Sequence, residues 1–206
     1  PDVSLWGDVK EILTKILEEL PEERHPEWVS ELEGYKNEMI LPAPKPYGPE
    51  AIIEEVHRHC TEDTVVATDV GQHQMWTMQF YPFEKPHTLL TSGGLGTMGY
   101  GLGAALGAKL GCPDRIVINV AGDGCFRMNM NELATASRYQ IPVIEVVVNN
   151  HVLGMVRQWQ TLFYGERYSA TVLNDSVDYV KVAEAMGVDG RRVTTQKEFD
   201  EAIQWA

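Results

Sequence analysis

The sequence predicts an α/β fold in which a parallel sheet is flanked by helices on both faces. Apolar runs rich in β-branched residues recur without polar alternation, as at 116–120 and 143–148, and such runs are typical of strands covered on both sides. Segments with helical periodicity separate the runs and can supply the crossovers that parallel strands need. Glycine or paired polar residues follow the runs, as expected where strands end in turns.

Composition bounds the kind of protein. The 206 residues are 44% hydrophobic, enough to bury one good core. The formal net charge is −13, and more than half of the 30 Asp and Glu residues lie in the first 63 residues, so the acidity belongs to an N-terminal solvated face. No basic stripe is present, which argues against a nucleic-acid partner. We find no signal peptide and no transmembrane run, which argues against a membrane partner. Three cysteines, without metal-binding spacing, indicate a reducing, cytoplasmic setting.

The first segment is predicted to be helical and separate from the main domain. Asp8 can cap a helix whose apolar stripe ends before Pro21, and a second helix begins at Pro26. The stripe has no obvious partner nearby. We therefore expect residues 1–40 to be the end of a preceding domain with a linker helix. The Pro-rich connector Leu41–Pro49 then opens the main domain, 41–206, which we expect to be truncated at its C-terminus.

The main domain begins with helices and short strands in alternation. Helix Glu50–Cys60 precedes strand Thr64–Thr68, and helix Gln74–Phe80 precedes the short strand Thr88–Ser92. The glycine-rich segment Gly93–Gly111 then becomes a helix. Three of its glycines are expected on one face for close backbone packing: Gly99, Gly103 and Gly107.

The central βαβ unit organises the prediction. Strand Ile116–Val120 leads into a tight turn at 122–124, helix Asn131–Tyr139 crosses over, and strand Val143–Val148 returns. Right-handed crossovers place the carboxyl ends of both strands on one edge of the sheet. Asp123 and Asn150 should therefore lie side by side, where open α/β sheets bind ligands. The rest is predicted as helices Val152–Tyr164 and Val177–Met186, a strand near Arg191–Val193, and helix Gln196–Ala206.

The oxygens of Asp123 and Asn150 are hard ligands, suited to magnesium or calcium rather than zinc. Gly124 and the helix that follows can direct backbone N–H groups at an anion in the same place. The physical prediction is a metal-bridged diphosphate. Either residue alone is better explained as an ordinary Asp-Gly turn or a capping Asn; the two together, at matching strand ends, favour a site.

The segment Gly94–Gly99 offers an alternative. It matches the G-x-G-x-x-G pattern of dinucleotide-binding proteins, after a strand and before a helix. However, no acidic residue ends the next strand before Asp123, and the glycines continue past the turn. A nucleotide-binding oxidoreductase therefore stays open as the weaker hypothesis, and a non-catalytic domain that kept the fold stays open as another.

A resemblance to a known family adds to this picture. Gly122-Asp123-Gly124, a 24-residue spacing (125–148) and then Asn149-Asn150 resemble the signature of thiamine diphosphate enzymes. The resemblance implies the thiamine diphosphate-binding fold. It also implies that a magnesium ion is held by Asp123, Asn150 and the backbone carbonyl of Val152.

Further motifs are similar to one branch of that family, the acetohydroxyacid synthase (acetolactate synthase) catalytic subunits. These motifs are Gly71-Gln72-His73, the string from Gly154 to Trp159, and Leu162-Phe163-Tyr164. The resemblance spans essentially the whole chain, which corresponds to a piece of the family's middle domain, the connector and then the C-terminal diphosphate-binding domain. The resemblance implies that Trp159 lines the substrate channel. The implied coenzyme contacts are Gln72, His73, Gly96, Thr97, Met98, Gly122, Asp123, Gly124, Cys125, Asn150, Val152, Leu153, Gly154 and Met155.

The resemblance also implies an activity for the parent protein. Acetolactate synthases are transferases of branched-chain amino acid biosynthesis that decarboxylate pyruvate and join the two-carbon unit to pyruvate or 2-ketobutyrate. The implied cofactors are thiamine diphosphate (thiamine pyrophosphate), Mg²⁺, and FAD held mostly by a domain outside this chain. A homodimer or tetramer is implied, and a regulatory subunit is left open.

The family's catalytic glutamate lies in a separate domain, so the catalytic residue is unknown here and the fragment alone is expected to be inactive. Glyoxylate carboligase, pyruvate oxidase and 2-keto acid decarboxylase remain alternatives within the family.

Overall fold

The computed structural model describes residues 2–38, 45–173 and 176–206. The chain divides into two compact units, residues 1–43 and 44–206. The first unit contains α1 (Val9–Glu19) and α2 (Pro26–Glu38). Asp8 caps α1 as predicted, because its side chain accepts hydrogen bonds from the backbone N–H groups of Lys10 and Glu11 at 3.0 and 3.2 Å. Neither helix has a buried residue among those described, so the apolar stripe of α1 is exposed.

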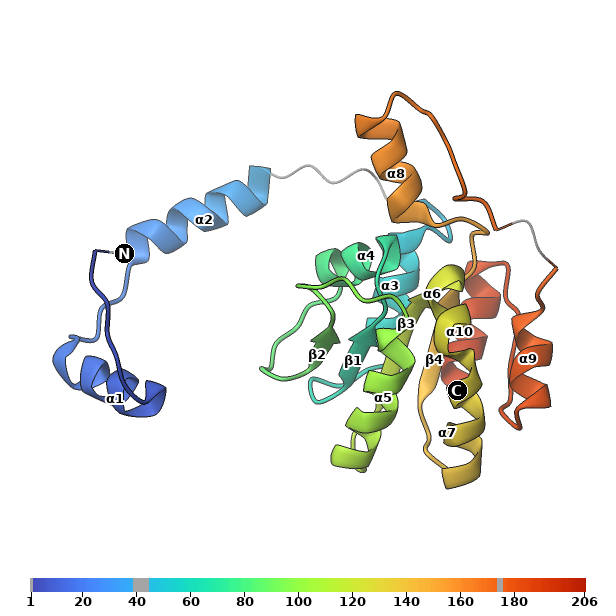
Figure 1. Cartoon of the computed structure of the whole chain (residues 1–206), viewed down its shortest axis with the longest axis horizontal. Helices are drawn as coiled ribbons and strands as arrows, with labels where there is room; N and C mark the ends of the chain where they lie inside the picture. Colours follow the sequence, from blue (N-terminus) through green and yellow to red (C-terminus); the bar gives the residue numbers. More distant parts are fainter. Residues whose placement is uncertain (1, 39–44, 174–175) are drawn as a thin grey trace. The chain divides into compact units, whose positions relative to one another are not determined.

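The second unit is built on a parallel sheet, as predicted (Figure 1). Its strands are β1 (Val65–Thr68), β2 (Leu89–Thr91), β3 (Val117–Gly122) and β4 (Ile144–Val148), in the order β2-β1-β3-β4. Every neighbouring pair is parallel, and the register aligns Thr68 with Val120 and Gly122 with Val148. The carboxyl ends of β1, β3 and β4 consequently meet at one edge.

Helices cover both faces of this sheet. The helices of the second unit are α3 (Pro49–Arg58), α4 (Gln72–Phe80), α5 (Tyr100–Gly111), α6 (Asp123–Asn129), α7 (Leu133–Tyr139), α8 (Gly154–Phe163), α9 (Tyr179–Ala185) and α10 (Gln196–Trp205), with a 3₁₀ turn at Met130–Glu132 between α6 and α7. On one face, Val66 and Ile118 pack against apolar residues of α3 and α10. On the other, Val65, Val117 and Ala121 pack against α5 and α7, which lie in front of the sheet in Figure 1. No helix among the described residues combines the length and apolarity needed to cross a bilayer.

Several predicted details are wrong, for physical reasons. β3 continues to Gly122 and α6 begins at Asp123, so there is no separate turn at 122–124. Residues 191–193 form no strand; Val193 packs on the core instead, and its carbonyl accepts a hydrogen bond from the Tyr47 hydroxyl at 3.1 Å. Among the described residues no strand pairs with β4 on its other side, so β4 ends the four-stranded sheet and is only partly buried, whereas β1 is buried throughout.

The glycines of α5 also differ from expectation. A Cβ atom added at Gly103 or Gly107 would meet nothing within 4 Å, so neither serves close packing. Gly99 is at the helix start with a φ of +88°, a left-handed conformation that favours glycine. The close approach is at Gly101, whose added Cβ would lie 2.9 Å from the backbone nitrogen of Asp69.

Candidate cofactor-binding site

Asp123 is the buried carboxylate at the centre of the candidate site. It follows β3 directly as the first residue of α6, and only 2% of its surface is exposed. Burial raises the pKa of this carboxyl group, while hydrogen bonds from backbone N–H groups oppose that rise. Among the described residues no lysine or arginine forms an ion pair with Asp123. A divalent cation is the partner that this buried carboxylate fits.

The loop after β4 is held against Asp123. The backbone N–H of His151 donates to Asp123 Oδ2 at 2.7 Å, and that of Gly124 donates to Oδ1 at 2.9 Å. His151 takes a left-handed φ of 56°, a conformation that costs a non-glycine residue about 1 kcal/mol or more. The bond to Asp123 holds this strained residue in place. The predicted convergence of the β3 and β4 ends is therefore observed.

Asn150 and Val152 present oxygens in the same loop. The Oδ1 atom of Asn150 accepts a hydrogen bond from the Val152 N–H at 3.1 Å, which orders the loop. A returning segment pairs with the loop, because Leu153 donates to the Thr171 carbonyl at 2.8 Å and Leu173 donates to the His151 carbonyl at 2.9 Å. This pairing does not use the Val152 carbonyl. Carboxylate, amide and backbone carbonyl oxygens thus gather at one edge, a donor set that fits magnesium.

A cavity of about 50 Å³ lies among these groups. Asp123, Asn150 and Val152 line it together, and Gly124 contributes backbone without a side chain. The predicted coenzyme contacts that line this cavity are Gln72, His73, Met98, Gly122, Asp123, Gly124, Cys125, Asn150, Val152, Leu153, Gly154 and Met155. The structure therefore brings these twelve residues, from four separate segments, to one place.

Gly96 and Thr97 are not among the residues that line the cavity. Both are exposed, and the Thr97 N–H donates to Ser92 Oγ at 3.0 Å. Gly96 has a φ of +63°, which suits glycine at this bend. Met98, two residues after Gly96, does reach the cavity, and a Cβ added at Gly124 would lie 3.8 Å from its Cε atom.

His73 and Gln72 belong to the first turn of α4, not to a loop before it. The His73 ring packs between two glycines, since an added Cβ would lie 2.8 Å from it at Gly71 and 2.9 Å from it at Gly122. Burial lowers the pKa of His73 to about 4. Its Nε2 atom has no hydrogen-bond partner among the described residues, so it is available to a ligand in the cavity. Gln72 Nε2 donates to Gln158 of α8 at 3.0 Å.

Asp69 is a buried carboxylate next to the candidate site that the sequence analysis did not single out. It is 1% exposed and follows β1 directly. Its carboxylate accepts hydrogen bonds from the backbone N–H groups of Gly99 and Gly101 at 2.9 and 3.1 Å. Asp69 thus fixes the start of α5, and with it Met98, beside the cavity. Its position directly after a buried strand, at the same edge as Asp123, is the signal that could have identified it.

Cys125 also lines the cavity, but its thiol is unreactive at neutral pH. Its thiol donates to the Val70 carbonyl at 2.7 Å, and burial raises its pKa to about 12. Such a thiol is not a nucleophile at neutral pH. All three cysteines are unpaired.

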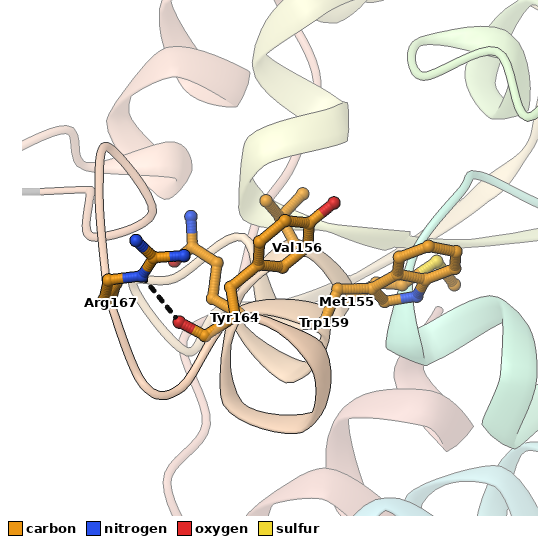
Figure 2. Close-up of a pocket in the computed structure, with 6 residues that line it drawn as sticks. Met155, Val156, Trp159, Tyr164 and Arg167 are labelled. Atoms are coloured by element: carbon orange, nitrogen blue, oxygen red, sulfur yellow. Dashed lines mark hydrogen bonds between the residues drawn. The ribbon is translucent and has the colours of Figure 1, made fainter.

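Trp159 lies on α8, which projects from the ligand-binding edge of the sheet (Figure 1). It lines a second cavity of about 570 Å³ together with Met155, Val156, Tyr164 and Arg167 (Figure 2). The indole is 56% exposed and packs edge-on against Phe163, with 5.4 Å between ring centroids. Met155 and Val156 line both cavities, so the larger cavity adjoins the smaller one. That arrangement suits an access route, although the structure does not place Trp159 in the smaller cavity.

Together, the fold and this edge define an α/β protein with a candidate ligand site at the carboxyl ends of its parallel strands, where such folds bind ligands. A family model described as "Thiamine pyrophosphate enzyme, C-terminal TPP binding domain" matches residues 69–206. The chain belongs to this family.

Relatives at higher similarity agree with this assignment. Over 76% of its length, the chain is 48% identical to the mitochondrial acetolactate synthase catalytic subunit of Aspergillus candidus. Over its full length, it is 43% identical to the acetolactate synthase large subunit of Corynebacterium glutamicum and 39% identical to the large subunit of acetolactate synthase isozyme 3 of Escherichia coli. It covers only 23%, 35% and 38% of those proteins, respectively. The predicted resemblance to acetolactate synthase catalytic subunits is confirmed.

A solved structure shows the same fold. It is the thiamine diphosphate-dependent 4-hydroxybenzoylformate decarboxylase of Rhodococcus jostii, with a TM-score of 0.73 and 24% identity. The likeness covers 81% of this chain and 31% of that one. It confirms the predicted thiamine diphosphate-binding fold.

Proposed function

We propose that this chain is the diphosphate-binding part of an acetolactate synthase catalytic subunit, which decarboxylates pyruvate and condenses the two-carbon unit with pyruvate or 2-ketobutyrate. The observation that carries the proposal is the buried Asp123, to which the loop after β4 is tied through the His151 N–H. Support also comes from relatives named acetolactate synthase that match the full length of this chain.

In this proposal each part of the edge has one role. Asp123, Asn150 and the Val152 carbonyl would hold Mg²⁺, while the α6 N-terminus at Gly124 faces the diphosphate. Gln72 and His73 would bind phosphate oxygens, with Gly96, Thr97, Met98 and the loop from Leu153 to Met155 around the coenzyme. Bound thiamine diphosphate supplies the electron sink for decarboxylation. Trp159 would line the route by which a 2-keto acid reaches it.

The proposal extends to the parent protein. FAD would be bound mostly by a domain outside this chain, and the enzyme would be a cytoplasmic homodimer or tetramer, to which a regulatory subunit can be added. The dinucleotide alternative is disfavoured by Asp69, because its carboxylate occupies the Gly99 and Gly101 N–H groups that a pyrophosphate would need.

Calorimetric titration with thiamine diphosphate tests the site. We expect binding that requires Mg²⁺ and that weakens at least about tenfold in Asp123→Ala, because a direct metal ligand is lost. Asp114→Ala, an exposed aspartate away from the cavity, is the matched control and should bind like the original chain. Unchanged affinity in Asp123→Ala, or tighter binding of NADH than of thiamine diphosphate, would refute the assignment.

A further inference from the structure

A second polar cluster lies between two helices of the main domain, away from the coenzyme edge. Glu55 and His59 are one turn apart on α3 and its C-terminal cap, and Asp200 faces them from α10. Residues 59–64 lead from α3 into the start of β1, so the cluster lies toward the amino ends of the strands. Asp123 lies at the opposite edge.

The geometry of the cluster is close to that of a metal centre. His59 Nε2 lies 3.1 Å from Glu55 Oε1 and 3.1 Å from Asp200 Oδ1, and the three ligand atoms lie within 4.8 Å of one another. Zinc bonds of about 2.0–2.2 Å in a tetrahedral arrangement separate neighbouring ligands by roughly 3.3–3.5 Å. A small adjustment of these side chains would therefore admit an ion.

Gln204 donates to Asp200 Oδ1 at 3.1 Å, but among the described residues Glu55 Oε1 has no hydrogen-bond donor other than His59. An imidazole Nε2 carries at most one hydrogen, yet here it faces two carboxylate oxygens. The Glu55 carboxylate is buried, with 3% of its side chain exposed. Arg58 and Gln196 donate to its other oxygen, at 2.6 and 3.2 Å, so neither donor serves Oε1.

Gln196 lies beside the cluster, because its Nε2 donates to Glu55 Oε2 at 3.2 Å. Its Oε1 atom is buried and accepts no hydrogen bond among the described residues. Gln196 and Asp200 are one turn apart on α10, as Glu55 and His59 are on α3, so the two helices present matching i, i+4 pairs. The amide oxygen is a candidate fourth ligand. Side-chain exposures of 26% for His59 and 41% for Asp200 leave a way in for an ion.

We propose that Glu55, His59 and Asp200 bind a divalent transition metal ion of the zinc class, which fastens α10 to α3. One imidazole nitrogen with carboxylate oxygens suits zinc, whereas magnesium prefers oxygen ligands alone. The ion would be structural, because it lies toward the amino ends of the strands and joins two helices that pack on the same core through Ile53 and Phe199.

The test is titration of the metal-free full chain with Zn²⁺, and with Co²⁺ as an optical probe. All variants carry Asp123→Ala so that the proposed magnesium site does not contribute. We expect one equivalent to bind, with a rise in Tm and the visible absorption of tetrahedral Co²⁺. His59→Gln and Asp200→Asn should each weaken binding at least about tenfold.

The matched control is His57→Gln on the same helix, because His57 contacts the Tyr81 ring and not the cluster. It should bind zinc like its parent. Circular dichroism checks that each variant is folded. If His59→Gln unfolds, the zinc affinity of Asp200→Asn is the test of the proposal. Absence of saturable binding, or parental affinity in a folded His59→Gln or Asp200→Asn variant, overturns the proposal.

Discussion

Glu145 is a carboxyl group placed inside the sheet. It faces Asn119 on the neighbouring strand, and Asn119 Nδ2 lies 2.9 and 2.8 Å from its two oxygens. Burial raises the pKa of Glu145 to about 8, while the Asn119 hydrogen bond acts in the opposite direction. Glu145 therefore keeps its proton in the folded protein at a pH where it would lose it in the unfolded chain.

This difference makes stability depend on pH. Between the ordinary pKa of 4.5 and the folded pKa of about 8, the folded state binds more protons, so the free energy of unfolding falls as pH rises. In Glu145→Gln, which keeps an acceptor for Asn119, this fall should be absent. Between pH 5 and pH 8, the free energy of unfolding of the variant should rise relative to that of the original chain by up to a few kcal/mol.

Urea denaturation at several pH values measures this gain. Glu184→Gln, at an exposed position of α9, is the control and should follow the original chain. Parallel pH profiles for Glu145→Gln and the original chain would show that Glu145 ionises normally.

At this scale the sequence predicted which residues lie together where residue type and spacing were informative. Asp123 and Asn150 were identified because an acid and an amide follow two buried strands, and the structure places both at one cavity. Asp69 and Glu145 were not identified, because their importance depends on burial and on partners 30 and 26 residues away in the sequence. No local pattern records those distances.

At the scale of the elements, the closest approach of the α5 backbone to the sheet is at its first turn. A Cβ added at Gly101 would collide with Asn119 Oδ1 and lie 2.9 Å from the Asp69 nitrogen. Because Asp69 also accepts the Gly101 N–H, this contact joins the start of α5 to the coenzyme edge. Gly103, half a turn later, is exposed.

The two glycines should therefore respond in opposite ways to alanine. Gly101→Ala should destabilise the chain by about 1–3 kcal/mol, the usual cost of overpacking. Gly103→Ala should stabilise it by about 0.5–1 kcal/mol, because alanine favours the helix and nothing lies within 4 Å. Chemical denaturation of both variants gives the comparison. A Gly101→Ala variant as stable as Gly103→Ala would mean that α5 is not held close to the sheet.

Strands and helices with strong periodicity were predicted with small errors at their ends, since β-branched runs and amphipathic stripes specify them locally. The failures share one cause. The strand expected near 191–193 and the full burial expected for β4 both depend on which segments become neighbours in the sheet. A strand needs a paired neighbour, and the residues beside β4 on that side supply none. Pairing of that kind is decided by the tertiary structure.

At the scale of the whole molecule, the chain spans well under half of its acetolactate synthase relatives. The groups that line the coenzyme cavity are suited to binding more than to proton transfer. Asp123 fits a cation, His73 is neutral at pH 7 with its pKa near 4, and the Cys125 thiol is protonated with its pKa near 12. General acid–base catalysis works best with a group whose pKa lies near the working pH. Neither His73 nor Cys125 meets that condition.

We therefore expect binding without turnover. The purified chain should bind thiamine diphosphate with Mg²⁺ but form no acetolactate from pyruvate beyond the reaction of the free coenzyme. Colorimetric detection of acetolactate, with a full-length acetolactate synthase assayed in parallel, measures this directly. Product formation that disappears in Asp123→Ala would contradict the prediction, because this chain would then carry its own proton-transfer group. Absence of both binding and turnover would instead count against the coenzyme site, so the two failures are distinguishable.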